Sequence, residues 1–252
     1  MNKTLKAALA ALLVAGSASG ARADLNINGA VGLPLNPTAQ IPDPGGVHIQ
    51  GNYYDKAGGG TSEVYGVVGA MRIGEQIEVN GGALRLNNAG GLSKTGLAIG
   101  GKYLFTRATD PAAVRIAAGA GYSRALIRNT HVYVVGTKSL AGLFNLQQNL
   151  TGHLGLRYDR FKAFGSSSKV SVYAGAEVPL SATGELSAVA EVQSKNIDGG
   201  DPPYSAGLRY RVPGKRYFVS AGVARTFDKA GFFVQLGTSF GTGFFSGTGV
   251  GE

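Results

Sequence analysis

The stretch 169-KVSVYAGAEVPLSATGELSAVAEVQ-193 consists of two alternating segments on either side of a small turn. In the first segment one side carries only valine and alanine, whereas the other side carries Lys169, Ser171, Tyr173, Gly175 and Glu177. The second segment is divided in the same way, with Glu185 and Glu191 on its polar side. A two-residue period of this kind indicates β-strands with one polar and one apolar face. The face that meets water therefore decides between a soluble β-protein and a membrane barrel.

The apolar face favours the membrane barrel. The same division recurs in 112–123, 150–159 and 204–211, and many of the apolar positions are alanine or glycine. The core of a soluble sandwich prefers large interlocking side chains. Lipid requires only hydrophobicity, and a wet lumen accepts both glycines and charges. We therefore expect an all-β fold, a single antiparallel up-and-down transmembrane β-barrel.

Turn residues divide the chain into about twelve strands. Glycine accounts for 41 of 252 residues, which argues against helices. The expected strands lie near 46–54, 63–72, 75–86, 94–106, 112–124, 129–136, 149–161, 168–179, 184–195, 203–212, 216–226 and 231–240. Tight turns at one end and longer loops at the other are typical of outer-membrane barrels. The segment 136–148 departs from this rule, because it is long but falls at the end with the tight turns.

The two ends of the chain lie outside the expected barrel. Residues 1–23 combine early lysines, an apolar run and an Ala-x-Ala site, which is typical of a cleaved signal peptide. We expect residues 24–45 to form an extended periplasmic lead-in or a plug, residues 46–240 the barrel, and residues 241–252 a C-terminal tail. This order predicts an outer-membrane protein that contacts lipid and is inserted by the barrel-assembly machinery. The chain has no cysteine, so neither disulfides nor thiol-bound metals contribute to it.

The charge of the chain is basic but dispersed. Loss of residues 1–23 removes Lys3, Lys6 and Arg22, which lowers the basic count from 24 to 21 against 15 acids and the net charge from +9 to +6. The sequence has no run of five or six basic residues, so nucleic acid is not expected as a partner. A modest basic excess instead favours anionic solutes or anionic lipid headgroups as partners.

The alternating pattern resembles that of small bacterial outer-membrane β-barrel proteins over the whole mature chain. The last expected strand, 231-GFFVQLGTSF-240, resembles their C-terminal insertion signal, although a tail follows it. The stretch 29-GAVGLPLNPTAQIPDPGG-46 resembles the entry segment of YjbH-type exopolysaccharide-associated barrels. This second resemblance implies a role in envelope or surface-polysaccharide export.

Charged residues share the face that is expected to line the lumen. They are Arg115, Arg157, Asp159, Lys169, Glu177, Glu185, Glu191, Arg209 and Arg211. A turn centred near Phe164 places Asp159 opposite Lys169. Two interpretations remain open: a salt-bridge network that closes a narrow barrel, or a selectivity surface along a water-filled pore.

Catalytic chemistry has little support in the sequence. The histidines are His48, His131 and His153, and none lies beside the serine or aspartate that would mark a barrel enzyme. His153 shares the lumen face and is interpreted as a polar lumen residue. We expect no catalytic residue, metal or cofactor.

The expected function is therefore non-enzymatic. The barrel would serve as a passive or narrow channel for small solutes, or as a structural barrel linked to envelope or surface-polysaccharide export. One alternative is an outer-membrane enzyme acting on lipid or peptide, which requires His131 or His153 to gain a serine or aspartate neighbour across strands. The other alternative is a soluble periplasmic β-barrel that binds a ligand.

Overall fold

The computed structural model describes most of the expected barrel. The described residues are 24–42, 46–57, 62–87, 93–106, 113–124, 128–140, 150–162, 166–181, 184–213 and 215–240. The predicted signal peptide, the C-terminal tail and most of the segment 136–148 lie outside these ranges and stay predictions. The described residues contain no helix long and apolar enough to cross a membrane.

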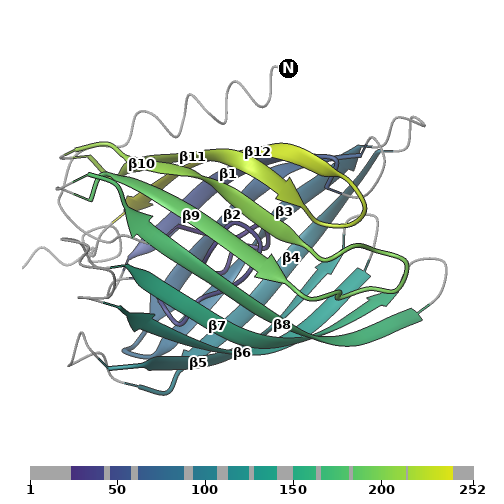
Figure 1. Ribbon diagram of the computed structural model, residues 1–252, viewed down its shortest axis with the longest axis horizontal. Helices are drawn as coiled ribbons and strands as arrows, with labels where there is room; N and C mark the ends of the chain where they lie inside the picture. The colour runs from purple at the N-terminus through teal and green to yellow at the C-terminus, as the bar shows by residue number, and fades with distance from the viewer. Residues whose placement is uncertain are drawn as a thin grey trace, which may run out of the picture.

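Twelve antiparallel strands form a closed barrel, which confirms the predicted fold class. Each strand pairs with its neighbours in sequence, and β1 pairs with β12 from Val47↔Phe240 to Tyr54↔Phe233 to complete the circle (Figure 1). The strands are β1 (Val47–Asp55), β2 (Glu63–Ile73), β3 (Ile77–Asn87), β4 (Ser93–Leu104), β5 (Arg115–Arg124), β6 (Arg128–Ser139), β7 (Thr151–Lys162), β8 (Ser166–Pro179), β9 (Leu186–Gln193), β10 (Tyr204–Arg211), β11 (Tyr217–Arg225) and β12 (Ala230–Phe240).

The register also follows the sequence pattern. No strand boundary differs by more than three residues from the predicted one. Asp159 pairs with Lys169 across the β7–β8 hairpin, as expected for a turn centred near Phe164. A one-residue slip would turn the apolar face into the lumen, so the alternating pattern specifies the register strongly.

The predicted difference in connection length between the two ends is wrong. We call the end where β1 begins and β12 ends the terminal end, and the opposite end the distal end. At the terminal end, 105–114 and 140–150 are long, whereas 125–127 and 163–165 at the distal end have three residues each. One reason is that β8 begins at Ser166, inside a serine-rich stretch whose composition suggested a loop.

The outer surface of the barrel is apolar. Leu97 is 68% exposed, and Val170, Ile99 and Leu154 are similarly exposed. Exposed aromatic residues lie near both ends, with Tyr103 and Phe105 at the terminal end and Phe232 at the distal end. An apolar band bordered by aromatic residues is the lipid-facing surface of an outer-membrane barrel. The protein is therefore an outer-membrane barrel, and the apolar face points to lipid.

Inward-facing glycines lie beneath the aromatic rings of neighbouring strands. A Cβ atom at Gly155 would overlap the ring of Tyr173, and one at Gly119 would overlap the ring of Tyr133. Both tyrosines are buried in the interior. The space left by these glycines is thus filled by their neighbours and does not widen the lumen.

The orientation of β8 can be tested with one substitution on its apolar face. Val172 is 48% exposed near the middle of the strand, so Val172→Arg should lower the free energy of unfolding in lipid vesicles by about 2–4 kcal/mol. Ser168→Arg is the matched control, because Ser168 has the same parity but lies nearer the distal end, where the cost falls to about 0–1 kcal/mol. Equal stability of the two variants would contradict the lipid-facing assignment.

Candidate functional site

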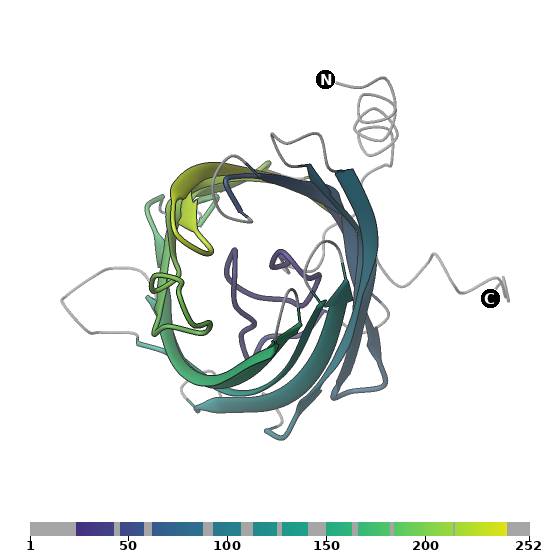
Figure 2. The same ribbon diagram turned by 90° about the vertical axis from the view of Figure 1, so that its right-hand side faces the viewer.

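Residues 24–42, which we call the internal segment, lie inside the barrel (Figure 2). Two isolated bridges, Leu25↔Val31 and Gly32↔Pro37, fold it back on itself. Gly29 has a φ of 97°, which an L side chain rarely adopts, so the first turn favours glycine at this position. Hydrogen bonds within the segment pair part of its backbone, for example Asn26 N with Ala30 O and Thr38 N with Val31 O. Its other backbone groups have no partner within it, and burial makes unpaired groups costly. The lumen wall therefore has to supply partners.

A buried ion pair on β3 and β4 supplies the first of these partners. The Lys102 ammonium lies 2.8 Å from the Glu78 carboxylate, and both side chains are fully buried. Lys102 also donates to the backbone oxygens of Val31 at 3.1 Å and Thr38 at 3.0 Å. The buried ammonium therefore has three oxygen atoms around it, one from the wall and two from the internal segment. Glu78 in turn accepts a hydrogen bond from Val31 N at 3.1 Å.

Glu191 on β9 holds the middle of the internal segment. Its carboxylate accepts hydrogen bonds from Leu35 N at 2.7 Å and from Asn36 N at 3.1 Å. The Asn36 side chain and the Ser205 hydroxyl donate to the same carboxylate at 3.0 and 2.7 Å. Four donors thus replace water around this buried charge, and hydrogen bonds to a charged acceptor are stronger than those between neutral groups.

Two arginines of β10 hold the start of the internal segment. Arg209 contacts Asp24 at 2.6 Å and Glu177 at 3.0 Å, and Arg211 contacts the same two acids at 2.7 and 3.1 Å. Arg209 also donates to the backbone oxygen of Gly32 at 3.4 Å. One acid of this cluster comes from the internal segment and the other from the wall. The internal segment is therefore part of the charge balance of the lumen.

Apolar contacts accompany the polar ones. Leu25 and Val31 pack with Val68 and Leu84 on one side of the lumen, and Leu35 packs with Phe233 on another. The space above Gly175 on β8 is occupied by the internal segment, because a Cβ atom there would overlap Leu33. The internal segment therefore fills the middle of the barrel.

Neutral side chains of the wall pair with further backbone groups of the internal segment. The Tyr173 hydroxyl donates to Pro37 O at 2.9 Å, and the Tyr54 hydroxyl donates to Pro34 O at 2.7 Å. Gln50 makes two bonds to Leu25, accepting from its N–H at 2.9 Å and donating to its oxygen at 2.7 Å. The contacts come from many strands, so the internal segment is held around its circumference.

The structure brings the predicted lumen charges into pairs, although not all as expected. Asp159 and Lys169 are register partners, yet Asp159 contacts Arg157 at 2.9 Å and Lys169 contacts Asp198 at 2.8 Å. Asp198 lies in the connection 194–203, and the hydrogen bond from Lys169 holds the pKa of its carboxyl below the ordinary value. Arg157 faces the internal segment and donates to the Asn36 side chain at 3.3 Å. Arg115 and Glu185 lie half-buried near the terminal end.

The histidines do not form a recognisable catalytic group. Thr137 Oγ1 and His153 Nδ1 lie 2.9 Å apart, but the same hydroxyl accepts a hydrogen bond from Ala39 N at 2.9 Å. Both side chains are buried under the internal segment. His131 and Asp159 are register partners across β6 and β7, yet Asp159 is hydrogen-bonded to Arg157 and Asn129. In the described part of the chain, no group of three or more acidic or histidine residues is arranged to hold a metal.

Sequence reasoning missed the pair formed by Glu78 and Lys102. A turn centred on Gly90 places these residues opposite each other, as the register of β3 and β4 shows. They could therefore have been found from the sequence in the same way as the partners in the β7–β8 hairpin. Asp24, in contrast, gives no such signal, because it lies outside the alternating pattern and meets the arginines only in the folded chain.

Comparison with known proteins places this architecture among outer-membrane barrels. No protein-family model and no curated protein sequence matches the chain. Among solved structures, the KdgM porin in complex with disordered oligogalacturonate matches with a TM-score of 0.54 and 12% identity, over 77% of this chain and 99% of that chain. The KdgM porin alone gives a TM-score of 0.53 and 11% identity, over 77% and 98%. The Acinetobacter baumannii outer membrane protein Omp33 gives 0.38 and 11%, over 77% and 96%.

The chain has the fold of a porin-type outer-membrane barrel. The KdgM match and the apolar exterior together confirm the predicted resemblance to small outer-membrane barrels and the location in the outer membrane. KdgM is described as a porin. The resemblance to YjbH-type barrels is not shown by these comparisons and stays a prediction.

The ion pair between Glu78 and Lys102 should stabilise the barrel together with the internal segment. Lys102→Met leaves Glu78 buried without its cation, so the free energy of unfolding should fall by about 3–5 kcal/mol. Glu78→Gln should also lower the free energy of unfolding. In the double variant Glu78→Gln/Lys102→Met this free energy should fall by less than the sum of the losses in the two single variants, because the two groups interact directly. Chemical denaturation in lipid vesicles measures all three values.

Lys94→Met is the matched control for this prediction. Lys94 lies on the same strand but is exposed, so its substitution should change stability by less than about 0.5 kcal/mol. Additive losses in the double variant would mean that Glu78 and Lys102 do not stabilise each other.

Proposed function

We propose that the protein is a passive outer-membrane channel for small solutes, and that the internal segment closes its lumen at rest. The observation that carries this proposal is the set of buried hydrogen bonds between the wall and the backbone of residues 24–42. The porin-type fold supports a transport role. The burial of Gln50, Arg209 and Gln235 at 0–2% exposure supports a resting state that is closed at the level of the internal segment.

The contacts of the internal segment are suited to reversible release. Each hydrogen bond that it makes with the wall can be exchanged for one with water, so its net contribution is only about 0.5–1.5 kcal/mol for a neutral pair and about 1.5–3 kcal/mol for a charged one. The apolar contacts of Leu25, Val31 and Leu35 oppose release. We therefore expect a channel that is closed most of the time and opens briefly.

The balance of charge in the buried wall supports weak selectivity. Four cationic groups, Lys102, Arg157, Arg209 and Arg211, are matched by four acids, Glu78, Asp159, Glu177 and Glu191. Charged rings of one sign select ions, whereas compensated pairs do not. Small solutes with little net charge are therefore the proposed cargo, in place of the anionic solutes that the net charge of the chain had suggested.

A cross-link between the internal segment and the wall tests the closure. The contact between Ala39 N and Thr137 Oγ1 places the two Cα atoms about 7 Å apart at most, near the limit for a disulfide. The natural chain has no cysteine, so Ala39→Cys/Thr137→Cys introduces the sole reactive pair. In planar lipid bilayers the oxidised variant should lose the conductance steps of the natural protein, and reduction should restore them.

The two single-cysteine variants are controls for the modification itself, and they should conduct like the natural protein before and after oxidation. A salt gradient applied in the same bilayers should give a reversal potential close to zero. Steps that persist unchanged in the oxidised variant would show that ions do not pass through the space filled by the internal segment.

A second variant should act in the opposite direction. Glu191→Gln replaces one acceptor oxygen by an amide that opposes the N–H groups of Leu35 and Asn36, so the closed state loses at least one strong hydrogen bond. The ratio of open to closed time should rise roughly tenfold to a hundredfold.

Glu185→Gln is the control for this variant. It makes the same change of charge at a half-buried position just before β9, near the terminal end. Glu185 takes no part in the hydrogen bonds that Glu191 makes with Leu35 and Asn36. Gating should therefore stay as in the natural protein. Absence of steps in both Glu191→Gln and the natural protein would overturn the channel and favour a purely structural barrel.

A further inference from the structure

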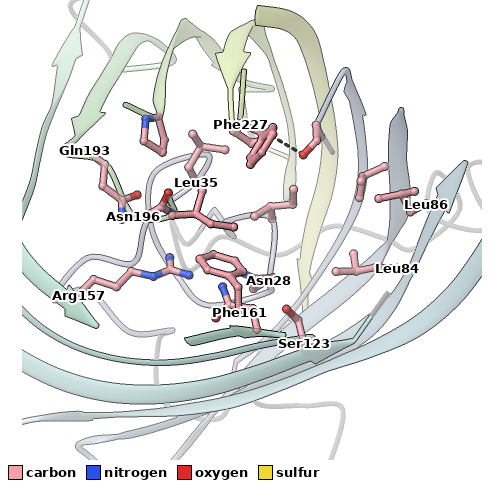
Figure 3. Close-up of a pocket in the computed structure, with 17 residues that line it drawn as sticks. Asn28, Leu35, Leu84, Leu86, Ser123, Arg157, Phe161, Gln193, Asn196 and Phe227 are labelled. Atoms are coloured by element: carbon pink, nitrogen blue, oxygen red, sulfur yellow. Dashed lines mark hydrogen bonds between the residues drawn. The ribbon is translucent and has the colours of Figure 1, made fainter. Parts of the chain in front are cut away.

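A cavity of about 190 Å³ lies at the distal end, above the internal segment (Figure 3). We call it the vestibule. Its floor is formed by Ile27, Asn28 and Leu35 of the internal segment, and its wall includes Leu84 and Leu86 of β3. The volume is below the roughly 300–1,000 Å³ that is typical of sites for drug-sized ligands. The vestibule therefore suits a smaller molecule.

The roof of the vestibule is built from connections that are fixed to one another. Residues 194–203 contribute Asn196, Ile197 and Pro203, and the connection after β11 contributes Thr226 and Phe227. These parts are joined by the hydrogen bond from Asp201 N to Phe227 O at 2.9 Å, and the Thr226 hydroxyl donates to Ala57 O. The ion pair of Lys169 with Asp198 fixes the same connection to β8. The cavity is thus preformed.

Two buried acceptors in the lining have no partner among the described residues. They are the side-chain oxygens of Asn129 and Asn196, in residues that are only 8% and 9% exposed. The Asn129 amide nitrogen donates to Asp159 at 2.9 Å, which fixes the orientation of that amide and leaves its oxygen as an acceptor. A buried acceptor without a donor is costly. A ligand with a hydroxyl or N–H group would satisfy it.

The rest of the lining defines the other properties of the ligand. Most of the lining residues are apolar, and Phe161 and Phe227 face the cavity from opposite sides (Figure 3). Arg157 is the charged residue among them, and its guanidinium is already bound to Asp159 at 2.9 Å and to the Asn36 side chain at 3.3 Å. An anionic ligand would therefore meet a compensated charge, and an uncharged ligand would avoid the cost of desolvation.

We propose that the vestibule is a binding site for a small uncharged molecule that has an apolar body and a hydroxyl or N–H donor. The donor group is held by one of the unpartnered amide oxygens, that of Asn196 or that of Asn129, and the apolar body packs against Leu84, Leu86 and Phe227. That this molecule is also a solute of the channel rests on the proposed function. Binding itself does not depend on it.

Isothermal titration calorimetry of the mature protein in detergent micelles tests this assignment, with titrations into micelles alone as blanks. The probes are benzyl alcohol, benzyl methyl ether, which has a similar body without a donor, and benzoate, which carries a negative charge. Benzyl alcohol should bind at least about fivefold more tightly than either of the other two, because one hydrogen bond is lost in each case. This comparison uses the natural protein and does not require any variant to fold.

Variants then locate the site. Asn196→Leu should weaken benzyl alcohol binding at least about fivefold and leave the methyl ether unchanged, because it removes an acceptor and keeps the volume. Leu86→Asn should weaken both probes. Leu97→Asn on the adjacent strand is the control, since Leu97 faces lipid and should not affect binding.

Three results would overturn the proposal: equal binding of the alcohol and the ether, tighter binding of benzoate, or heats indistinguishable from those of the micelle blanks. None of them depends on conductance. Conductance without binding in the vestibule would therefore overturn only the binding site. Binding in the vestibule without conductance would overturn only the channel.

Discussion

The structure depends on the mutual hydrogen bonding of the lumen wall and the internal segment. A twelve-stranded barrel encloses a space intermediate between small barrels filled by side chains and open porin channels. Charged residues in such a space are costly unless they are paired or hydrogen-bonded. Residues 24–42 supply the missing groups, because their backbone N–H groups bind Glu78 and Glu191 and their backbone oxygens bind Lys102. The wall stabilises an irregular segment, and the segment stabilises a charged wall.

This dependence explains the unusual composition of the lumen face. An interior that contacts a folded segment needs polar groups at fixed places and room between them. Glycines such as Gly175 provide the room, because Leu33 of the internal segment occupies the space where a side chain would lie. Other inward glycines, such as Gly155, accept the ring of a neighbouring tyrosine. The same glycines that suggest an open lumen therefore allow a packed one.

The internal segment also connects the two proposals. The residues that close the lumen, among them Leu35, form the floor of the vestibule at the distal end. Asn36, adjacent to that floor, is held by both Glu191 and Arg157. A molecule bound in the vestibule thus contacts the segment whose release would open the channel. Because ligand binding and closure share residues, a ligand bound in the vestibule should change the free energy of releasing the internal segment.

Sequence alone determined the strands, their register and the face that meets lipid, because a two-residue period fixes both the conformation and the direction of each side chain. It also placed Arg157, Glu177, Glu191 and Arg209 on the inner face. Which charges meet was decided by the tertiary structure: Asp159 faces Lys169 in register but pairs with Arg157, and Asp24 reaches Arg209 only because the chain folds back into the lumen. The internal segment has no periodicity, since its backbone bonds partly within its own turns and partly to side chains of the wall, from Gln50 on β1 to Gln235 on β12. Its position therefore exists only once the barrel has closed around it.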